Sequence, residues 1–194
     1  GSLLCCGSGG KIVTLFKFNK QLELEWKHTV GQSNHYNCIG NIIQLPDSSY
    51  VTGMTFMFQW DGDARVVHLT KNGVTDWIAN IDGPFQDAYC QVIRDHDSSY
   101  LAVSSYTTTM THYGDIQYGK FQVSRISSDG HRLWSKTIGP VTYYPVISSY
   151  IRLPDSTYVF SGPSDQWSQG YMFRINGNGD SLLYRNFAYP DPKM

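Results

Sequence analysis

The sequence predicts an all-β protein, a β-propeller built from repeated four-stranded antiparallel blades. Three observations predict this fold: a turn motif that occurs three times, a glycine hairpin motif in the same register, and a composition that suits short strands. The 194 residues include 18 glycines and 14 tyrosines, and only 16% are charged. Glycine permits tight turns and tyrosine favours half-buried strands, whereas a disordered chain would carry more charge and fewer aromatic rings.

The turn motif is the first element of the repeat. Its three copies are Leu45–Val51, Asp95–Leu101 and Leu153–Val159, and the tyrosine in each copy recurs after 50 and then 58 residues. Clusters of Pro, Asp and Ser form tight turns, because the Asp and Ser side chains hydrogen-bond to the backbone two residues on. Each copy therefore predicts a turn that leads into a strand.

The hairpin motif is the second element. A glycine is followed four residues later by a tryptophan, or by the leucine that replaces it, at Gly73–Trp77, Gly130–Trp134 and Gly179–Leu183. Trp26 repeats the end of this motif near the start of the chain. Asn72 and Gly73 predict a type I′ hairpin, because that turn needs a positive φ at both central positions.

One unit of the repeat translates into four strands. Residues 41–45, 50–53, 66–70 and 76–81 are rich in aliphatic and aromatic side chains and are separated by the turns just described. Four antiparallel strands in about 50 residues make one propeller blade. The repeat therefore predicts the blade as the building unit.

The predicted organisation is one propeller domain over residues 1–194. It divides into a partial blade without its first strand (1–31), three complete blades (32–83, 84–139 and 140–187) and a tail (188–194). Three arrangements stay open: a piece of a larger ring of about six to eight blades, a four-bladed ring that the tail closes, and a dimer of two half-rings. The larger ring is favoured, because the tail carries two prolines and little strand character.

These motifs give the sequence a family resemblance. It resembles the secreted bacterial repeat propellers, in which a Tyr-Val-x-x-Gly strand, here Tyr50–Gly53, follows a Pro-Asp-Gly-type turn and a Gly-x-x-x-Trp strand, here Gly73–Trp77, ends the blade. Quinoprotein-type propellers share this blade ending. The resemblance covers nearly the whole chain and implies an extracytoplasmic location, secreted or on the outer surface. It carries over no functional residue, and Ser2–Cys5 resembles a lipoprotein cleavage box that no apolar stretch precedes.

Composition disfavours several classes of function. The 15 basic residues are balanced by 16 acidic ones, whereas a nucleic-acid-binding surface normally shows a basic excess. No run approaches the roughly 18 apolar residues of a membrane-spanning helix, so the chain is not expected to cross a membrane. The cysteines form no CxxC pair, which disfavours a zinc site. Cys38 and Cys90 are interpreted as small buried hydrophobic residues, and a bridge between them stays open.

The residues also predict no catalytic centre, metal or cofactor. The six histidines are scattered over different expected strands and turns, so a nucleophile, base and acid are not expected to meet. Asp61–Asp63 and Asp95–Asp97 could each offer two oxygen ligands to calcium, but neither continues into a full ligand loop. Both segments are interpreted as solvated turns.

The candidate site residues are aromatic residues of the variable loops between strands two and three and between blades. These are Trp60, Tyr106, Tyr113, Trp167, Tyr36, Tyr89 and Tyr144. Aromatic rings among Asn, Gln, Asp and Ser suit glycan or peptide ligands. The expected function is a non-catalytic extracellular or cell-surface module that binds a glycan or a surface protein. Two alternatives stay open: a structural propeller within a larger cell-envelope assembly, and an enzyme whose active site draws on blades outside this chain.

Overall fold

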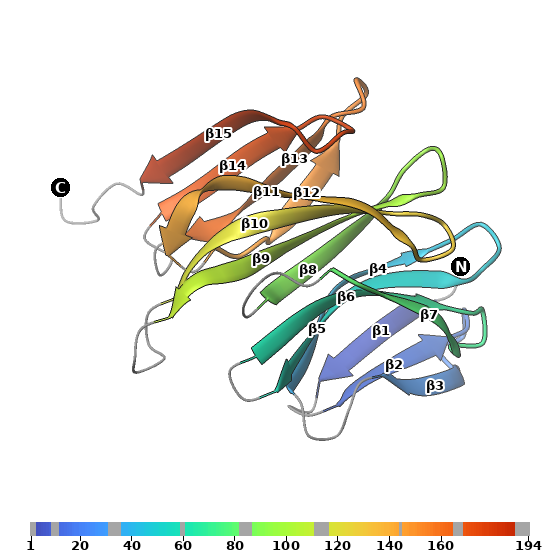
Figure 1. Ribbon diagram of the computed structural model, residues 1–194. Coiled ribbons are helices and arrows are strands. Elements are labelled where there is room, and N and C mark those ends of the chain that lie inside the picture. The colour runs from blue at the N-terminus through green and yellow to red at the C-terminus, as the bar shows by residue number, and fades with distance from the viewer. Residues whose placement is uncertain are drawn as a thin grey trace.

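The computed structural model describes residues 3–8, 12–30, 36–58, 61–81, 87–110, 117–143, 145–164 and 169–188. These residues form fifteen strands in four antiparallel sheets, numbered here in chain order (Figure 1). The predicted all-β class is confirmed. No helix long and apolar enough to span a membrane occurs in this described part of the chain.

Each sheet is made of consecutive strands. Sheet 1 contains β1 (Leu3–Ser8), β2 (Val13–Phe18) and β3 (Leu24–Val30), and sheet 2 contains β4 (Tyr36–Gln44), β5 (Tyr50–Phe58), β6 (Asp61–Leu69) and β7 (Thr75–Asn80). Sheet 3 contains β8 (Asp87–Arg94), β9 (Tyr100–Met110), β10 (Gln117–Ile126) and β11 (Arg132–Tyr143). Sheet 4 contains β12 (Ser149–Arg152), β13 (Tyr158–Ser164), β14 (Gln169–Ile175) and β15 (Ser181–Ala188).

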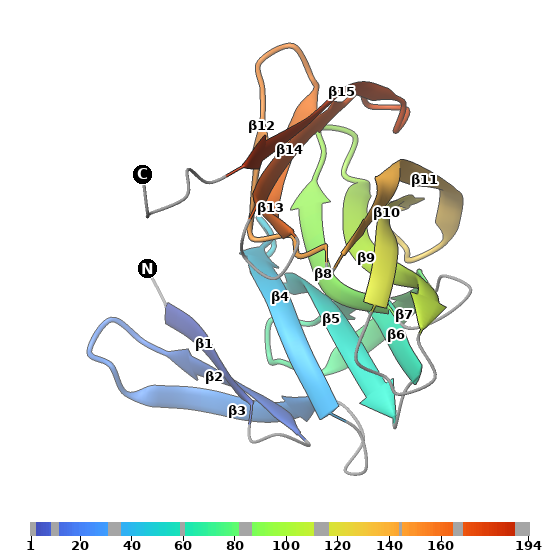
Figure 2. The same cartoon turned by 90° about the vertical axis from the view of Figure 1, so that its left-hand side faces the viewer.

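The four sheets follow one another around an open arc, with sheets 1 and 4 at its two ends (Figure 2). A buried apolar cluster fills each of the three junctions between consecutive sheets. The first strands of sheets 2, 3 and 4 converge, because the Asn41 amide bonds to the backbone of Val92 and also donates to the Tyr150 hydroxyl. This arrangement is consistent with a propeller, but the sheets do not close into a ring.

The strands are longer than the sequence predicts. β5 continues to Phe58 and β9 to Met110, so Tyr106 lies in a strand and not in a loop. Tyr36 and Tyr89 likewise fall within β4 and β8. The loop assignment of these residues is wrong, because the sheet pairing extends well beyond the short apolar runs that mark the strand centres.

The glycine hairpin also differs from its prediction. Asn72 does not have a positive φ. Gly73 is the residue of this turn that does, with a φ of 80°. The Gly73 amide donates to the Thr70 carbonyl, and the pairing of β6 with β7 shifts register after His68. The turn is thus a type I turn closed by a left-handed glycine with a bulge, and not type I′.

These glycines have a second role, at the junctions between sheets. A Cβ on Gly73 would lie 2.8 Å from Trp26 Cζ3, and one on Gly130 would lie 2.7 Å from Trp77 Cδ2. Gly179 stands in the same relation to Trp134, at 2.6 Å. The tryptophan of each last strand therefore packs on the glycine turn of the next sheet. We call this contact the Trp–Gly clamp.

Candidate functional site

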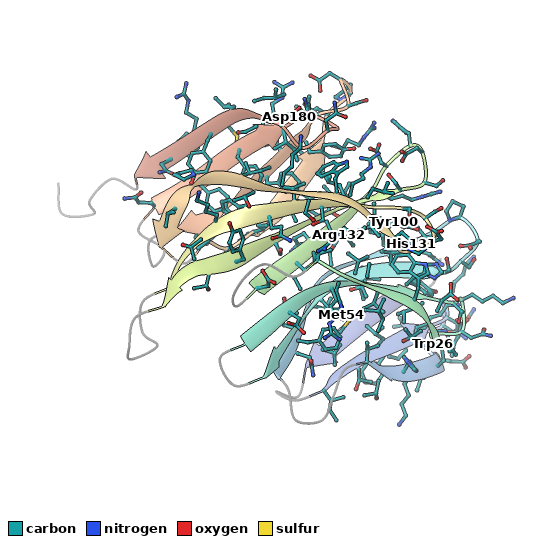
Figure 3. The ribbon with its side chains drawn as sticks, viewed as in Figure 1. Trp26, Met54, Tyr100, His131, Arg132 and Asp180 are labelled. Atoms are coloured by element: carbon teal, nitrogen blue, oxygen red, sulfur yellow. The ribbon has the colours of Figure 1, made fainter. Side chains whose placement is uncertain are left out.

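A pocket of about 550 Å³ lies between sheets 2 and 3. The pocket opens at the end of the sheets where the turn and hairpin motifs lie. We call this end the turn face, and we call the opposite end the loop face. Trp26, Tyr100, His131 and Asp180 all lie toward the turn face (Figure 3). The residues that line this junction pocket are Leu45, Pro46, Asp47, His68, Asp76, Trp77, Arg94, Ser98, Tyr100, Ser128 and Asp129.

His68 stands at one wall of the junction pocket, between a serine and an aspartate. Its Nε2 lies 3.1 Å from Ser49 Oγ and its Nδ1 lies 3.0 Å from Asp76 Oδ2. The imidazole also stacks on Trp77, with 5.3 Å between ring centroids. Sequence reasoning did not find this cluster. Serine, histidine and aspartate in this order are the parts of a hydrolytic triad, so their roles must be tested against the hydrogen bonds.

The hydrogen bonds assign Ser49 to the turn. Ser49 Oγ donates to Asp47 Oδ1 at 2.6 Å, and the Ser49 amide donates to the same oxygen at 3.0 Å. The same hydroxyl-to-aspartate bond recurs in the turns of sheets 3 and 4. Because the single hydroxyl proton is held by a carboxylate, Ser49 does not offer it to His68 as a nucleophile would.

A basic residue occupies the position of His68 in every sheet. The strand register gives its equivalents, and each of them pairs with a carboxylate of its own sheet: Lys17, Arg125 and Arg174. In sheets 3 and 4 that carboxylate belongs to the turn. His68 is the basic residue at this position in sheet 2, and in each sheet this residue connects the third strand to the first turn or to the fourth strand. We call this contact the turn pin.

The partner of Arg94 distinguishes the junction of sheets 2 and 3 from the junction of sheets 3 and 4. Its equivalent, Arg152, lies with its Nε 3.5 Å from Asp95 Oδ1. Both arginines donate through Nη2 to the serine of the following turn, so their side chains have similar orientations. In the described part of the chain, however, Arg94 forms no ion pair, because Leu45 occupies the place of Asp95.

Asp95 fills the equivalent position at the junction of sheets 3 and 4 and binds residues of both sheets. Its carboxylate lies 2.6 Å from Arg125 Nη1 and accepts a hydrogen bond of 2.5 Å from the Tyr158 hydroxyl. Burial raises its pKa, but the bonds from Tyr158, the His96 amide and Arg125 outweigh burial and hold the pKa of Asp95 below its usual value. The interpretation of Asp95–Asp97 as a solvated turn is therefore wrong for Asp95 itself.

The junction pocket combines donors and acceptors. Arg94 and Ser98 can donate, while the carboxylates of Asp47, Asp76 and Asp129 can accept. Hydrogen bonds from Ser49 lower the pKa of Asp47, and a hydrogen bond from Ser127 lowers that of Asp129, so both carboxyl groups are ionised at neutral pH. The pocket can therefore bind a neutral polar ligand that both donates and accepts hydrogen bonds.

Of the predicted site residues, Tyr106 is the one whose side chain is described. It is 8% exposed, and its hydroxyl lies 3.2 Å from Thr137 Oγ1, so its ring packs within sheet 3 and is not presented to a ligand. The backbone of Tyr36 and Tyr89 lies in strands, as described above. Trp60, Tyr113, Tyr144 and Trp167 lie outside the described residues.

The cysteines and carboxylates give no metal centre in the described ranges, where no three His, Cys, Asp or Glu side chains gather around one point. Cys38 and Cys90 are free thiols, and burial raises the pKa of both. Asp63 lies in β6 and pairs with Arg65 at 2.7 Å, so the interpretation of Asp61–Asp63 as a solvated turn is wrong.

Comparison with known proteins gives a likeness of fold. No protein-family model matches the sequence, and no curated protein matches it. A crystal structure of an ACO/RPE65 chimera and one of a mutant ACO from Synechocystis are similar, each with a TM-score of 0.52 and 11% identity. The match covers 97% of this chain and 46% of each of those chains, so the chain spans less than half their length. At this identity the likeness shows the fold alone.

Proposed function

We propose that this chain is a non-catalytic binding module of the extracellular space or cell surface, and that it recognises a glycan. We propose further that its sheets are blades of a β-propeller. The observation that supports binding is the junction pocket, where Arg94 lacks the carboxylate that its equivalent, Arg152, has in Asp95. A ligand that hydrogen-bonds to Arg94 satisfies this arginine.

The chemistry of the pocket favours a saccharide over an anion. Three carboxylates at the pocket repel an anion, while Arg94 and the carboxylates together offer both donors and acceptors to hydroxyl groups. A sugar hydroxyl can accept from Arg94 and donate to Asp76 or Asp129 at the same time. The pocket walls also contain Trp77 and Tyr100, and apolar surface with a few placed polar groups is typical of small-ligand sites.

Two further points belong to this proposal. The sequence also predicts a second contact surface on the loop face, made of aromatic residues that include Trp60 and Trp167. The alternative function, a structural propeller within a larger assembly, is favoured by one observation: Phe187 at the end of the arc is 52% exposed, although its equivalents in the other sheets are buried.

The test is a glycan array probed with the purified chain, followed by titration calorimetry with the glycans retained. We expect Arg94→Met to weaken binding at least about tenfold, since a hydrogen bond to a charged group contributes about 1.5–3 kcal/mol. Lys27→Met, which likewise replaces a basic side chain by methionine at an exposed position of β3, is the control and should bind like the wild type. Trp167→Ala reports on the loop face.

The outcomes separate the alternatives. Loss of affinity in Arg94→Met with Lys27→Met unchanged supports the junction pocket. Loss in Trp167→Ala alone contradicts the pocket and assigns the site to the loop face. A folded chain that retains no glycan on the array, but binds a surface protein, contradicts the choice of a glycan.

A further inference from the structure

We infer that the open faces of sheets 1 and 4 are the two halves of one junction, and that they pack together between two copies of this chain arranged head to tail. This inference rests on the propeller arrangement proposed above. It follows from comparing the two open faces with the three junctions that the structure already contains.

The face of β15 at the end of the arc has the pattern of a junction face. Four positions after its tryptophan, each of the first three sheets buries an aliphatic side chain: Val30, Ile81 and Ile138. The same spacing from Leu183 leads to Phe187, which is 52% exposed. A large aromatic side chain therefore stands uncovered where every junction buries its equivalent.

Sheet 1 presents the matching apolar face. The strand register places Phe16 and Phe18 at the positions of Val67 and Leu69 in sheet 2, which are fully buried against sheet 1. Phe16 and Phe18 are only partly buried, and their rings stack on each other with centroids 6.5 Å apart. This face corresponds to the side of each later sheet that receives the preceding sheet.

The sizes of the two faces match at the Trp–Gly clamp. In the turn of sheet 1 the clamp glycine is replaced by Leu22, which has a φ of 62° and is 69% exposed. In sheet 4 the clamp tryptophan is replaced by Leu183. A tryptophan could not lie against Leu22 as it does against glycine, whereas a leucine can. The two replacements compensate each other if these faces meet.

Their charges match as well. At the junction of sheets 3 and 4, Lys136 Nζ lies 2.5 Å from Asp180 Oδ1, and Asp180 also accepts a hydrogen bond from Asn176. By position, Glu23 in sheet 1 is the equivalent of Asp180, and it accepts the same bond from Asn19.

Arg185 on β15 is the equivalent of Lys136. It is exposed, and within the described residues it forms no ion pair. A junction between sheet 4 and sheet 1 therefore brings Arg185 to Glu23.

The complement of each open face is thus carried by the same sequence, which identifies a second copy as the partner. Within one copy the two faces lie at opposite ends of the arc and do not meet (Figure 2). Two copies placed head to tail form both junctions at once, which closes the assembly with two-fold symmetry. Closure also covers the exposed Phe187 of each copy.

Native mass spectrometry and light scattering test this dimer. We expect a dimer for the wild type, and at least a tenfold rise in the dimer dissociation constant for Glu23→Arg or Arg185→Glu alone, since each places like charges together at both junctions. Mixing the two single variants restores both pairs and should restore the dimer. Lys71→Glu, a charge reversal at an exposed turn residue of sheet 2, which has no open end face, is the control.

Two results would overturn the inference: a monomeric wild type, or single variants that dimerise like the wild type. Glycan binding is measured on the same variants, because the junction pocket lies between sheets 2 and 3. A variant that loses the dimer and keeps its glycan separates this inference from the proposed function.

Discussion

At the scale of single residues, the turn pin explains why a histidine, a serine and an aspartate meet without forming a catalytic centre. The first turn of sheets 2, 3 and 4 holds a hydroxyl against an aspartate, and a basic residue from the third strand contacts this pair. The sequence predicts the turn, because Pro, Asp and Ser carry a local signal. It does not predict the basic residue, because that residue reaches the turn only through the pairing of strands.

Replacing His68 tests the turn pin. His68→Arg should keep the free energy of unfolding within about 0.5 kcal/mol, because Arg125 and Arg174 occupy the same position in sheets 3 and 4. His68→Ala should cost about 1–2 kcal/mol, because Asp76 and Ser49 lose a partner. Urea unfolding measures both. A larger loss in the arginine variant than in the alanine variant would contradict the structural role of this position.

The turn aspartates predict a loss of stability in acid. Hydrogen bonds from the Ser99 hydroxyl and amide, with Arg125 nearby, lower the pKa of Asp97 to about 2, against an ordinary 3.8. A carboxyl whose pKa is depressed by folding stabilises the fold above its unfolded pKa, and this contribution is lost as the pH falls toward the folded pKa. The melting temperature should therefore fall between about pH 4 and pH 2. Asp97→Asn, already lacking this contribution, should show a smaller fall across that interval.

At the scale of strands and turns, the hairpin glycines join local geometry to the packing between sheets. The sequence predicts where these hairpins lie, since a glycine at fixed spacing from a tryptophan recurs. It does not predict that each tryptophan lies on the glycine of the next sheet. The strand lengths are also underpredicted, because the outer parts of β5 and β9 carry Met, Thr and Ser where the apolar alternation ends.

Two glycines of the same kind of hairpin provide a matched test. Gly130→Ala should cost about 2–4 kcal/mol, because its φ is 89° and a Cβ there would lie 2.7 Å from Trp77. Gly177→Ala, whose Cβ would have its nearest neighbour at 4.0 Å, should change stability by less than about 0.5 kcal/mol. Thermal and urea unfolding of both variants give the comparison. Equal losses would mean that the Trp–Gly clamp contributes nothing specific.

At the scale of the whole molecule, the four sheets and their order around an arc follow from the repeat, whereas the site does not. A repeat fixes what the sheets share, and the junction pocket exists because the junction of sheets 2 and 3 departs from that of sheets 3 and 4: Leu45 stands where Asp95 stands in sheet 3. That departure is visible in the aligned turn motifs. Its meaning is not, because Arg94 and Tyr100 reach the pocket from the neighbouring sheet.

The central claim is that this departure creates the binding site, and one substitution tests it most directly. Leu45→Asp copies the junction of sheets 3 and 4 into the junction pocket, where the new carboxylate can pair with Arg94 and accept from Tyr100, as Asp95 does with Arg152 and Tyr158. The measurement is the affinity of a glycan selected on the array, for the wild type and for Leu45→Asp, by titration calorimetry. We predict binding to the wild type and at least about tenfold weaker binding to a folded variant. Equal affinity in the two proteins would contradict the claim.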